Sequence, residues 1–168
     1  MGVSGSGKST IADALGKRLG WRFEDGDRFH PAANVAKMSA GHPLTDADRW
    51  PWLNAIADEI ERTCTYGGHV IIACSALKHA YRDVLSRGRR DVRFVFLQGA
   101  PELIASRLAH RKGHFMPPEL LASQFRTLEP PEAGEHVVTV AIDAPVEAIV
   151  DDVLRQLKLD AASHGPSS

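Results

Sequence analysis

Residues 1–10 read MGVSGSGKST, and Gly2 to Ser9 match the pattern G-x-x-x-x-G-K-[ST] at every fixed position. The glycines let the backbone curl so that its amide N–H groups point inward around phosphate oxygens, and the helix that follows directs its positive end to the same point. In such a loop, Lys8 reaches the β- and γ-phosphates and the Ser9 hydroxyl ligates Mg²⁺. The stretch therefore predicts a nucleoside triphosphate site between a strand and a helix.

The composition is that of one ordinary globular domain. The chain has 168 residues, of which 43% are hydrophobic and 24% charged, and its net charge is −1. A nucleic-acid groove or a membrane surface needs a basic excess, so neither is expected. We find no apolar run near the ~20 residues of a membrane span and no signal peptide, and two cysteines are too few for a disulfide framework. We expect a cytoplasmic protein with one domain over residues 1–159 and a disordered tail over 160–168.

Apolar periodicity predicts an alternation of helices and strands. Helical patterns occupy residues 8–20, 31–41, 45–68, 75–88, 101–113, 119–130 and 145–159. Short apolar runs predict strands over residues 21–25, 69–74, 91–99 and 136–143. Strands of this kind, each followed by a helix, indicate an α/β fold with a parallel sheet and helices on both of its faces.

Three polar segments follow the predicted strands, at the sheet edge where ligands of open α/β folds bind. The first contains Asp25 and Asp27, which in extended backbone face the same side. One carboxylate can hold Mg²⁺ through water while the other takes the proton of an attacking hydroxyl. The alternative is an aspartate–glycine turn without a chemical role, because these residue types also favour turns.

The second and third segments are basic. Lys78 and Arg82 lie four residues apart at the start of a predicted helix, where the macrodipole disfavours cations. This suggests an anionic ligand such as a substrate carboxylate, with a solvated helix face as the alternative. Arg107 and Arg111 share a later helix face before a loop rich in glycine and proline. They predict a lid over residues 107–120 that neutralises a transferring phosphate, and the alternative is a basic surface helix.

The phosphate loop by itself does not identify the acceptor of the phosphate. A small-molecule kinase, a nucleotide kinase and a non-catalytic switch that binds a nucleoside triphosphate all remain compatible with it. The remaining motifs are more specific. They are GVSGSGKST, DGDRFHPAANVAKMSAGHPLTDADRWPWL, CSALKHAYRDVL, SRLAHRKGHFM and SQFRTLEPP. Together they resemble gluconokinases of the small, shikimate-kinase-like group, and the resemblance covers residues 2–158.

This resemblance implies that ATP, with Mg²⁺, phosphorylates the 6-hydroxyl of D-gluconate. It also implies a P-loop NTPase fold of the adenylate and shikimate kinase type, with strand order 2-3-1-4-5, and a homodimer. The residues implied to bind ATP and its metal are Gly2, Ser4, Gly5, Ser6, Gly7, Lys8, Ser9 and Thr10. Asp27 is implied to contact the acceptor hydroxyl, with Asp25 near the metal. The gluconate ligands are implied to be His30, Arg49, Lys78 and Arg82, and the lid-side arginines Arg107 and Arg111. A kinase for shikimate or another sugar acid, and a non-catalytic module, are the alternatives.

In the order 2-3-1-4-5 the first strand is central, yet Met1 alone stands before Gly2. We therefore expect that roughly five to eight apolar residues precede Gly2 and form this strand. Without the strand, two half-sheets would face each other with unpaired backbone groups, each costing about 1–3 kcal/mol if buried. For a chain that begins at Met1, we expect weak stability and poor ATP binding despite the intact motif.

Overall fold

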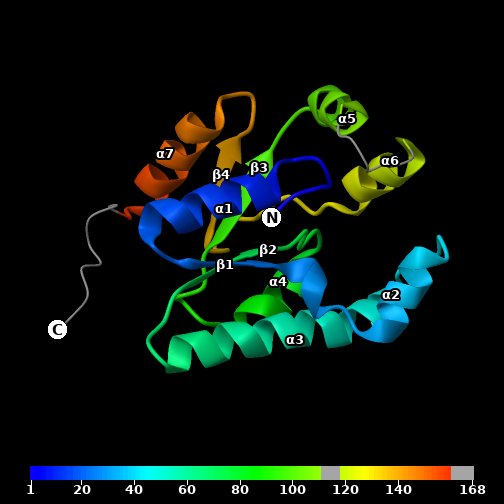
Figure 1. The fold of residues 1–168 in the computed structure, drawn as a ribbon, viewed down its shortest axis with the longest axis horizontal. Coiled ribbons are helices and arrows are strands. Elements are labelled where there is room, and N and C mark those ends of the chain that lie inside the picture. Colours follow the sequence, from blue (N-terminus) through cyan, green and yellow to red (C-terminus); the bar gives the residue numbers. More distant parts are fainter. Residues whose placement is uncertain (111–117, 160–168) are drawn as a thin grey trace.

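The computed structural model describes residues 1–110 and 118–159 (Figure 1). The expected tail over 160–168 and half of the expected lid, residues 111–117 with Arg111, lie outside the described residues. The helices are α1 (Lys8–Leu19), α2 (Ala32–Ser39), α3 (Asp46–Thr65), α4 (His79–Ser86), α5 (Pro101–Ala109), α6 (Pro118–Thr127) and α7 (Val146–Leu157), with a 3₁₀ turn η1 (Gly26–Phe29). The strands are β1 (Arg22–Asp25), β2 (Val70–Ala73), β3 (Phe94–Gln98) and β4 (Val137–Ala141).

Helices cover both faces of the parallel strands. In Figure 1, α1 and α7 lie on one side of the strands, and α3 and α4 lie on the other. Each layer has its own apolar core. Ile11, Leu15 and Val153 belong to the core beneath α1 and α7, whereas Leu53 and Leu85 belong to the core beneath α3 and α4. The predicted α/β class with helices on both faces is confirmed.

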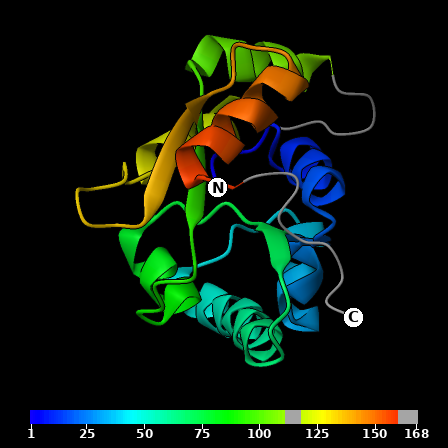
Figure 2. The ribbon, with the colours of Figure 1, turned by 90° about the vertical axis from the view of Figure 1, so that its left-hand side faces the viewer.

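The strands form two separate parallel pairs, β1 with β2 and β3 with β4. In the expected order 2-3-1-4-5, strand 1 is the central strand, so β1 and β2 are the expected strands 2 and 3, and β3 and β4 are the expected strands 4 and 5. The expected central position between them is held at one end by Met1 and Gly2. The Gly2 amide donates to the Ser75 carbonyl after β2 at 3.1 Å, and the Met1 carbonyl accepts from the Leu97 amide of β3 at 3.0 Å. Figure 2 shows the amino terminus in the middle of the molecule. The phosphate loop therefore starts between the two pairs.

Helix α4 begins later than the sequence predicts. Residues 75–77 are not helical, Ala76 has a φ of 45°, and Lys78 is the N-cap residue. The expectation that Lys78 and Arg82 share one face of the opening turns is therefore wrong. Arg82 is only 2% exposed, and its guanidinium donates to the carbonyls of Ala76 and Leu77 at 3.2 and 3.3 Å. These bonds satisfy carbonyl groups that a helix would otherwise use, so the buried arginine explains the late start.

Arg82 also links α4 to the segment after α6. Its guanidinium makes a two-point ion pair with Glu135, at 2.5 and 3.0 Å, and donates to the Glu129 carbonyl at 3.2 Å. The hydrogen bond from Arg82 is the largest cause that lowers the pKa of Glu135 to about 2. His79 lies 3.1 Å from the same carboxylate, which raises the pKa of the imidazole. Arg82 therefore joins the segment before α4 to the segment after α6 by buried hydrogen bonds.

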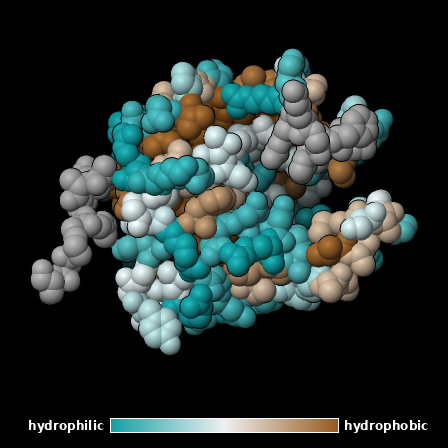
Figure 3. Space-filling view, viewed as in Figure 1, coloured by the Kyte–Doolittle hydropathy of each residue, from teal (hydrophilic) through white to brown (hydrophobic). Residues whose placement is uncertain are grey.

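The outer surface is mostly hydrophilic in the view of Figure 3. Brown, apolar areas in that view lie in the upper part of the molecule, and a smaller one lies on α2. On α2, Val35 and Met38 are 49% and 43% exposed. Among the described helices, we find none that is both long and apolar enough to cross a membrane. The apolar side chains of the two cores are otherwise enclosed between the helices and the strands.

The buried pair of Arg82 and Glu135 predicts a specific acid sensitivity. The pKa of Glu135 is lowered in the folded chain from its ordinary value of 4.5 to about 2, so the unfolded chain binds more protons between these values. Stability from this group is complete above pH ~5 and is lost as the pH falls towards 2. We expect Glu135→Gln to lower the free energy of unfolding at pH 7 by about 3 kcal/mol, because it leaves a buried cation without its counter-charge.

Urea unfolding of the wild type and Glu135→Gln at pH 7, 4 and 2.5 measures this effect. We expect the difference between the two proteins to shrink as the pH falls. The exposed neighbour Glu132→Gln serves as the control and should follow the wild type at every pH. A difference between wild type and Glu135→Gln that stays constant down to pH 2.5 would contradict the assignment.

Candidate active site

The phosphate loop is shaped for an anion. Gly7, the N-cap residue of α1, has a φ of +91°, a left-handed conformation that favours glycine. The Ile11 amide donates to the Gly7 carbonyl at 2.9 Å, so the amides before Ile11 lie ahead of the hydrogen-bonded part of the helix. The first turn carries no acidic side chain, and Ser9 and Thr10 are exposed there. This helix terminus can therefore accept phosphate oxygens.

Lys8 lies across the loop that precedes it. Its ammonium donates to the Val3 carbonyl at 2.9 Å, and Val3 itself is buried. The side chain of Ser6 is also buried, and within the described residues its hydroxyl has no hydrogen-bond partner. The bond from Lys8 thus holds the backbone of the loop at Val3.

Two helices near the expected lid pack against the loop. The Ser4 amide donates to the side-chain carbonyl of Gln124 in α6 at 2.7 Å, and the Gln124 amide donates back to the Ser4 hydroxyl at 3.1 Å. A Cβ atom on Gly5 would lie 2.6 Å from the side chain of Leu108 in α5. Sequence reasoning did not find Gln124, because its partner is 120 residues away. The loop and α6 therefore form one bonded unit.

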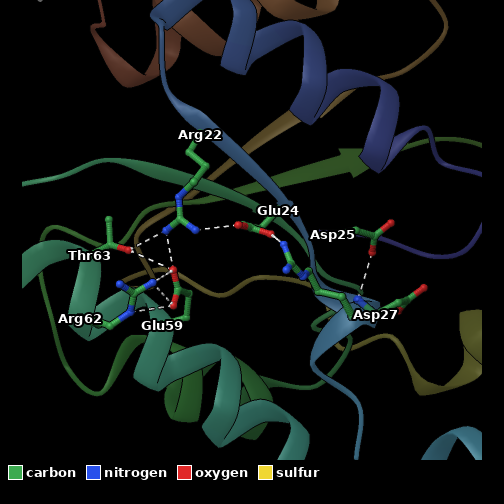
Figure 4. A network of polar contacts seen from close by, with 8 residues as sticks. Arg22, Glu24, Asp25, Asp27, Glu59, Arg62 and Thr63 are labelled. Atoms are coloured by element: carbon green, nitrogen blue, oxygen red, sulfur yellow. Dashed lines mark hydrogen bonds and ion pairs between the residues drawn. The ribbon is translucent and has the colours of Figure 1, made fainter.

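Asp25 and Asp27 lie in a turn directly after β1 (Figure 4). Asp25 caps η1, since its carboxylate accepts from the Asp27 amide at 3.0 Å. The expectation of extended backbone through both residues is wrong, because Asp27 belongs to the 3₁₀ turn. The carboxylate of Asp27 is 87% exposed and is therefore available to a ligand. The segment therefore forms the aspartate–glycine turn, and this turn still leaves the Asp27 carboxylate accessible for a chemical role.

A charged network holds this turn against the rest of the protein. Glu24, the buried residue before Asp25, accepts from Arg22 at 2.6 Å and also from Arg28 of η1. Arg22 continues the network to Glu59 of α3, as Figure 4 shows. On the other side, the Trp52 indole donates to the Gly26 carbonyl at 2.8 Å. The position of Asp27 is thus fixed by contacts with α3.

His30 supports Asp27 from the same side. Its ring stacks on Trp52 with centroids 4.3 Å apart, and its Nδ1 lies 3.3 Å from the amide nitrogen of Asn34. Its Nε2 lies 3.9 Å from the Asp27 carboxylate. Burial lowers the pKa of His30, so the imidazole is neutral at pH 7. His30 is therefore held beside the Asp27 carboxylate without a hydrogen bond to it, and only 6% of its side chain is exposed.

A second group of side chains joins the start of α3 to the start of α4. Asp46 accepts from the Lys78 ammonium at 3.0 Å and from the Tyr81 hydroxyl. The Arg49 guanidinium lies 5.8 Å from the centre of the Tyr81 ring. The bond from Tyr81, followed by that from Lys78, lowers the pKa of Asp46. We call Asp46, Arg49, Lys78 and Tyr81 the basic cluster, which holds two cations and one carboxylate.

The remaining predicted residues lie elsewhere. The Arg107 guanidinium donates to the Ile142 carbonyl after β4 at 2.6 Å, and Arg111 is outside the described residues. Arg82 is directed towards Glu135 rather than joining the basic cluster. Asp46 and Tyr81 are members of that cluster that sequence reasoning missed. The helical pattern that starts at residue 45 indicated where α3 begins, and a capping box at Thr45 confirms this start, but the pattern does not indicate that Asp46 meets a residue from α4.

Comparison with known proteins gives a consistent family. The shikimate kinase family model matches residues 4–158. A probable gluconokinase of Rattus norvegicus is 47% identical, covering 94% of this chain and 95% of the relative. The thermoresistant gluconokinase of Escherichia coli K12 is 44% identical, covering 94% and 91%. A crystal structure of a gluconokinase from Sinorhizobium meliloti 1021 has a TM-score of 0.84 and 45% identity, covering 94% and 89%. Because the matches extend over nearly the whole of each protein, the chain belongs to the gluconokinases of the shikimate kinase family.

Proposed function

We propose that the protein transfers the γ-phosphoryl group of ATP to the 6-hydroxyl of D-gluconate, giving 6-phospho-D-gluconate and ADP. The observation that supports this most strongly is the identity of 43–47% with gluconokinases over nearly the whole chain. The placement of the described site residues is compatible with it. The phosphate loop follows Met1, the exposed carboxylate of Asp27 follows β1, and the segment with Lys78 and Tyr81 of the basic cluster follows β2.

The loop is the donor half of the proposed site. Its amides and Lys8 hold the phosphates and neutralise the charge that develops on the transferred group. When Mg²⁺ is bound with ATP, the Ser9 hydroxyl and, through water, the Asp25 carboxylate would hold it, and the metal would neutralise phosphate charge. Mg²⁺ commonly takes only one or two protein ligands and keeps several waters. Accordingly, a larger cluster of carboxylates on the protein is not needed for this metal.

The turn after β1 and the basic cluster form the acceptor half. Asp27 accepts the proton of the 6-hydroxyl of gluconate. At the same time the hydroxyl oxygen bonds to the γ-phosphorus, and the bond between the γ-phosphorus and the leaving ADP oxygen breaks. Lys78 and Arg49 bind the gluconate carboxylate at the other end of the substrate. Asp46 and the Tyr81 ring hold these cations in place before the substrate arrives. Burial of Arg82 favours a positioning role for this residue over direct contact with gluconate.

Three further parts of the proposal come from the family resemblance. The enzyme works as a homodimer in the cytoplasm, and Arg107 and Arg111 reach the transferred phosphate from the lid. The Arg107 guanidinium donates to the Ile142 carbonyl. Its proposed role therefore requires that it exchange this bond for one to a phosphate oxygen when ATP binds.

Replacing the proposed base separates binding from chemistry. We expect Asp27→Asn to lower kcat with gluconate by about 10²–10⁴-fold, because the amide cannot take the proton. ATP affinity should change little, since Asp27 is not part of the loop. A coupled assay of ADP release measures kcat, and a fluorescent ATP analogue measures affinity. Asp13→Asn on α1, a change at a side chain that is 48% exposed, is the control. Retention of wild-type kcat by Asp27→Asn would refute its role, and absence of turnover in both proteins would favour a non-catalytic module.

Removing a cation of the basic cluster tests the acceptor site. We expect Lys78→Ala to raise the KM for gluconate by about tenfold or more and to leave the KM for ATP nearly unchanged, because a charge-assisted bond to the carboxylate is lost. Initial rates with each substrate varied in turn give both constants. Lys17→Ala is the matched control, since Lys17 is an exposed lysine on α1 paired with Asp13. A larger effect on ATP than on gluconate would overturn the assignment.

The bond between Gln124 and Ser4 predicts that α6 supports ATP binding. Gln124→Leu keeps the approximate size of the side chain but removes both hydrogen bonds to the loop. We expect the KM for ATP to rise about fivefold while the KM for gluconate stays near the wild-type value. Gln156→Leu on α7, which loses a bond to the Thr139 carbonyl, controls for the loss of a glutamine. Equal KM values for ATP in Gln124→Leu and wild type would contradict the coupling.

A further inference from the structure

Helix α2 buries a single residue, and that residue is the polar Asn34. Its exposed fraction is 4%, whereas Val35 and Met38 on the same helix are 49% and 43% exposed. Apolar packing alone would bury the valine or the methionine in its place. Burying an amide costs free energy unless its polar groups make hydrogen bonds. The bonds of Asn34 therefore indicate what its burial serves.

Two contacts decide how the Asn34 side chain is turned. Its Nδ2 lies 2.8 Å from the backbone carbonyl oxygen of Asp48 in α3. A carbonyl oxygen can only accept, so the atom beside it must be the amide nitrogen and not the amide oxygen. The same nitrogen lies 3.3 Å from Nδ1 of His30, and its second hydrogen is available for this contact. Nδ1 of His30 must therefore accept, and it carries no proton.

The proton of the His30 ring is thereby assigned to Nε2. Burial is the largest cause that lowers the pKa of His30, so at pH 7 the ring is neutral and has one N–H. A neutral imidazole has one donor and one acceptor nitrogen. Because Nδ1 is the acceptor, Nε2 is the donor, and Nε2 lies 3.9 Å from the Asp27 carboxylate. Stacking on Trp52, with centroids 4.3 Å apart, holds the plane of the ring.

We propose that Asn34 is a positioning residue that holds His30 in its Nε2–H tautomer beside Asp27. This tautomer turns an N–H towards the carboxylate, whereas the other would turn a lone pair towards it and repel it. A protonated Nε2 also cannot take the proton of the attacking hydroxyl, which leaves that proton to Asp27. The consequence for catalysis rests on the proposed function, but the assignment of the tautomer does not.

Nitrogen NMR of the imidazole rings at pH 7 tests the tautomer in the wild type. The chemical shifts of the two ring nitrogens differ strongly according to which of them carries the proton. The chain has eight histidines, and the signals that disappear in His30→Gln identify those of His30. We expect the Nε2–H pattern alone. An Nδ1–H pattern, a mixture of the two tautomers or a doubly protonated ring would overturn the proposal.

The variant Asn34→Leu keeps the approximate size of the side chain and removes the donor to Nδ1. We expect the Nδ1–H tautomer of His30 to appear in this variant. We also expect kcat with gluconate to fall about fivefold, as for the loss of one hydrogen bond, while the KM for ATP stays near the wild-type value. Asn54→Leu on α3 is the matched control, because Asn54 also donates to a backbone carbonyl, that of Trp50, at 2.9 Å. The control should keep the wild-type tautomer and kcat.

A folded Asn34→Leu protein with the wild-type tautomer, or with a changed tautomer and an unchanged kcat, would overturn the positioning role. If this variant does not fold, the measurement on the wild type decides. Absence of turnover with gluconate in the wild type would count against the proposed function alone, since the tautomer is determined without substrate.

Discussion

The backbone bonds of Met1 and Gly2 are the constraint on which the rest of the site depends. They place the start of the phosphate loop between β2 and β3, at the edge where the strands end. From this point the loop leads into α1, and the segments after β1 and β2 bring the acceptor residues to the same edge. The positions of the proposed ligands thus depend on a short stretch of backbone, Met1 and Gly2, that bonds to both strand pairs. Within the described residues, no ladder joins these two pairs directly.

The acceptor side is held by charge rather than by apolar packing alone. Glu24 and its arginines fix the turn that carries Asp27, and Asp46 fixes Lys78. Arg82 is a third case, in which a buried guanidinium is matched by Glu135 and by backbone carbonyls. Arg28, Lys78 and Arg82 are each held by a carboxylate from another segment of the chain. The partly exposed pairs of Arg28 and Lys78 set geometry more than stability, because such pairs contribute little free energy. The buried pair of Arg82 and Glu135 contributes to both.

Local patterns in the sequence were sufficient for the fold but not for all of the site. The phosphate loop, the alternation of helices and strands, and the start of α3 at Thr45 depend on neighbouring residues, and each was predicted. The start of α4 was not, because Arg82 bonds to Glu135, 53 residues further along the chain. Tyr81 and Asp46 are 35 residues apart, and Gln124 meets Ser4 across 120 residues. No periodicity or capping signal encodes contacts of that kind.

The central claim is that this site phosphorylates gluconate in preference to related acids. The most direct test compares kcat/KM for D-gluconate and for shikimate in one ADP-release assay, with saturating ATP and Mg²⁺. We predict a preference for gluconate of at least about 100-fold, because the chain is 43–47% identical to gluconokinases over nearly its whole length. Turnover with shikimate but none with gluconate would contradict it.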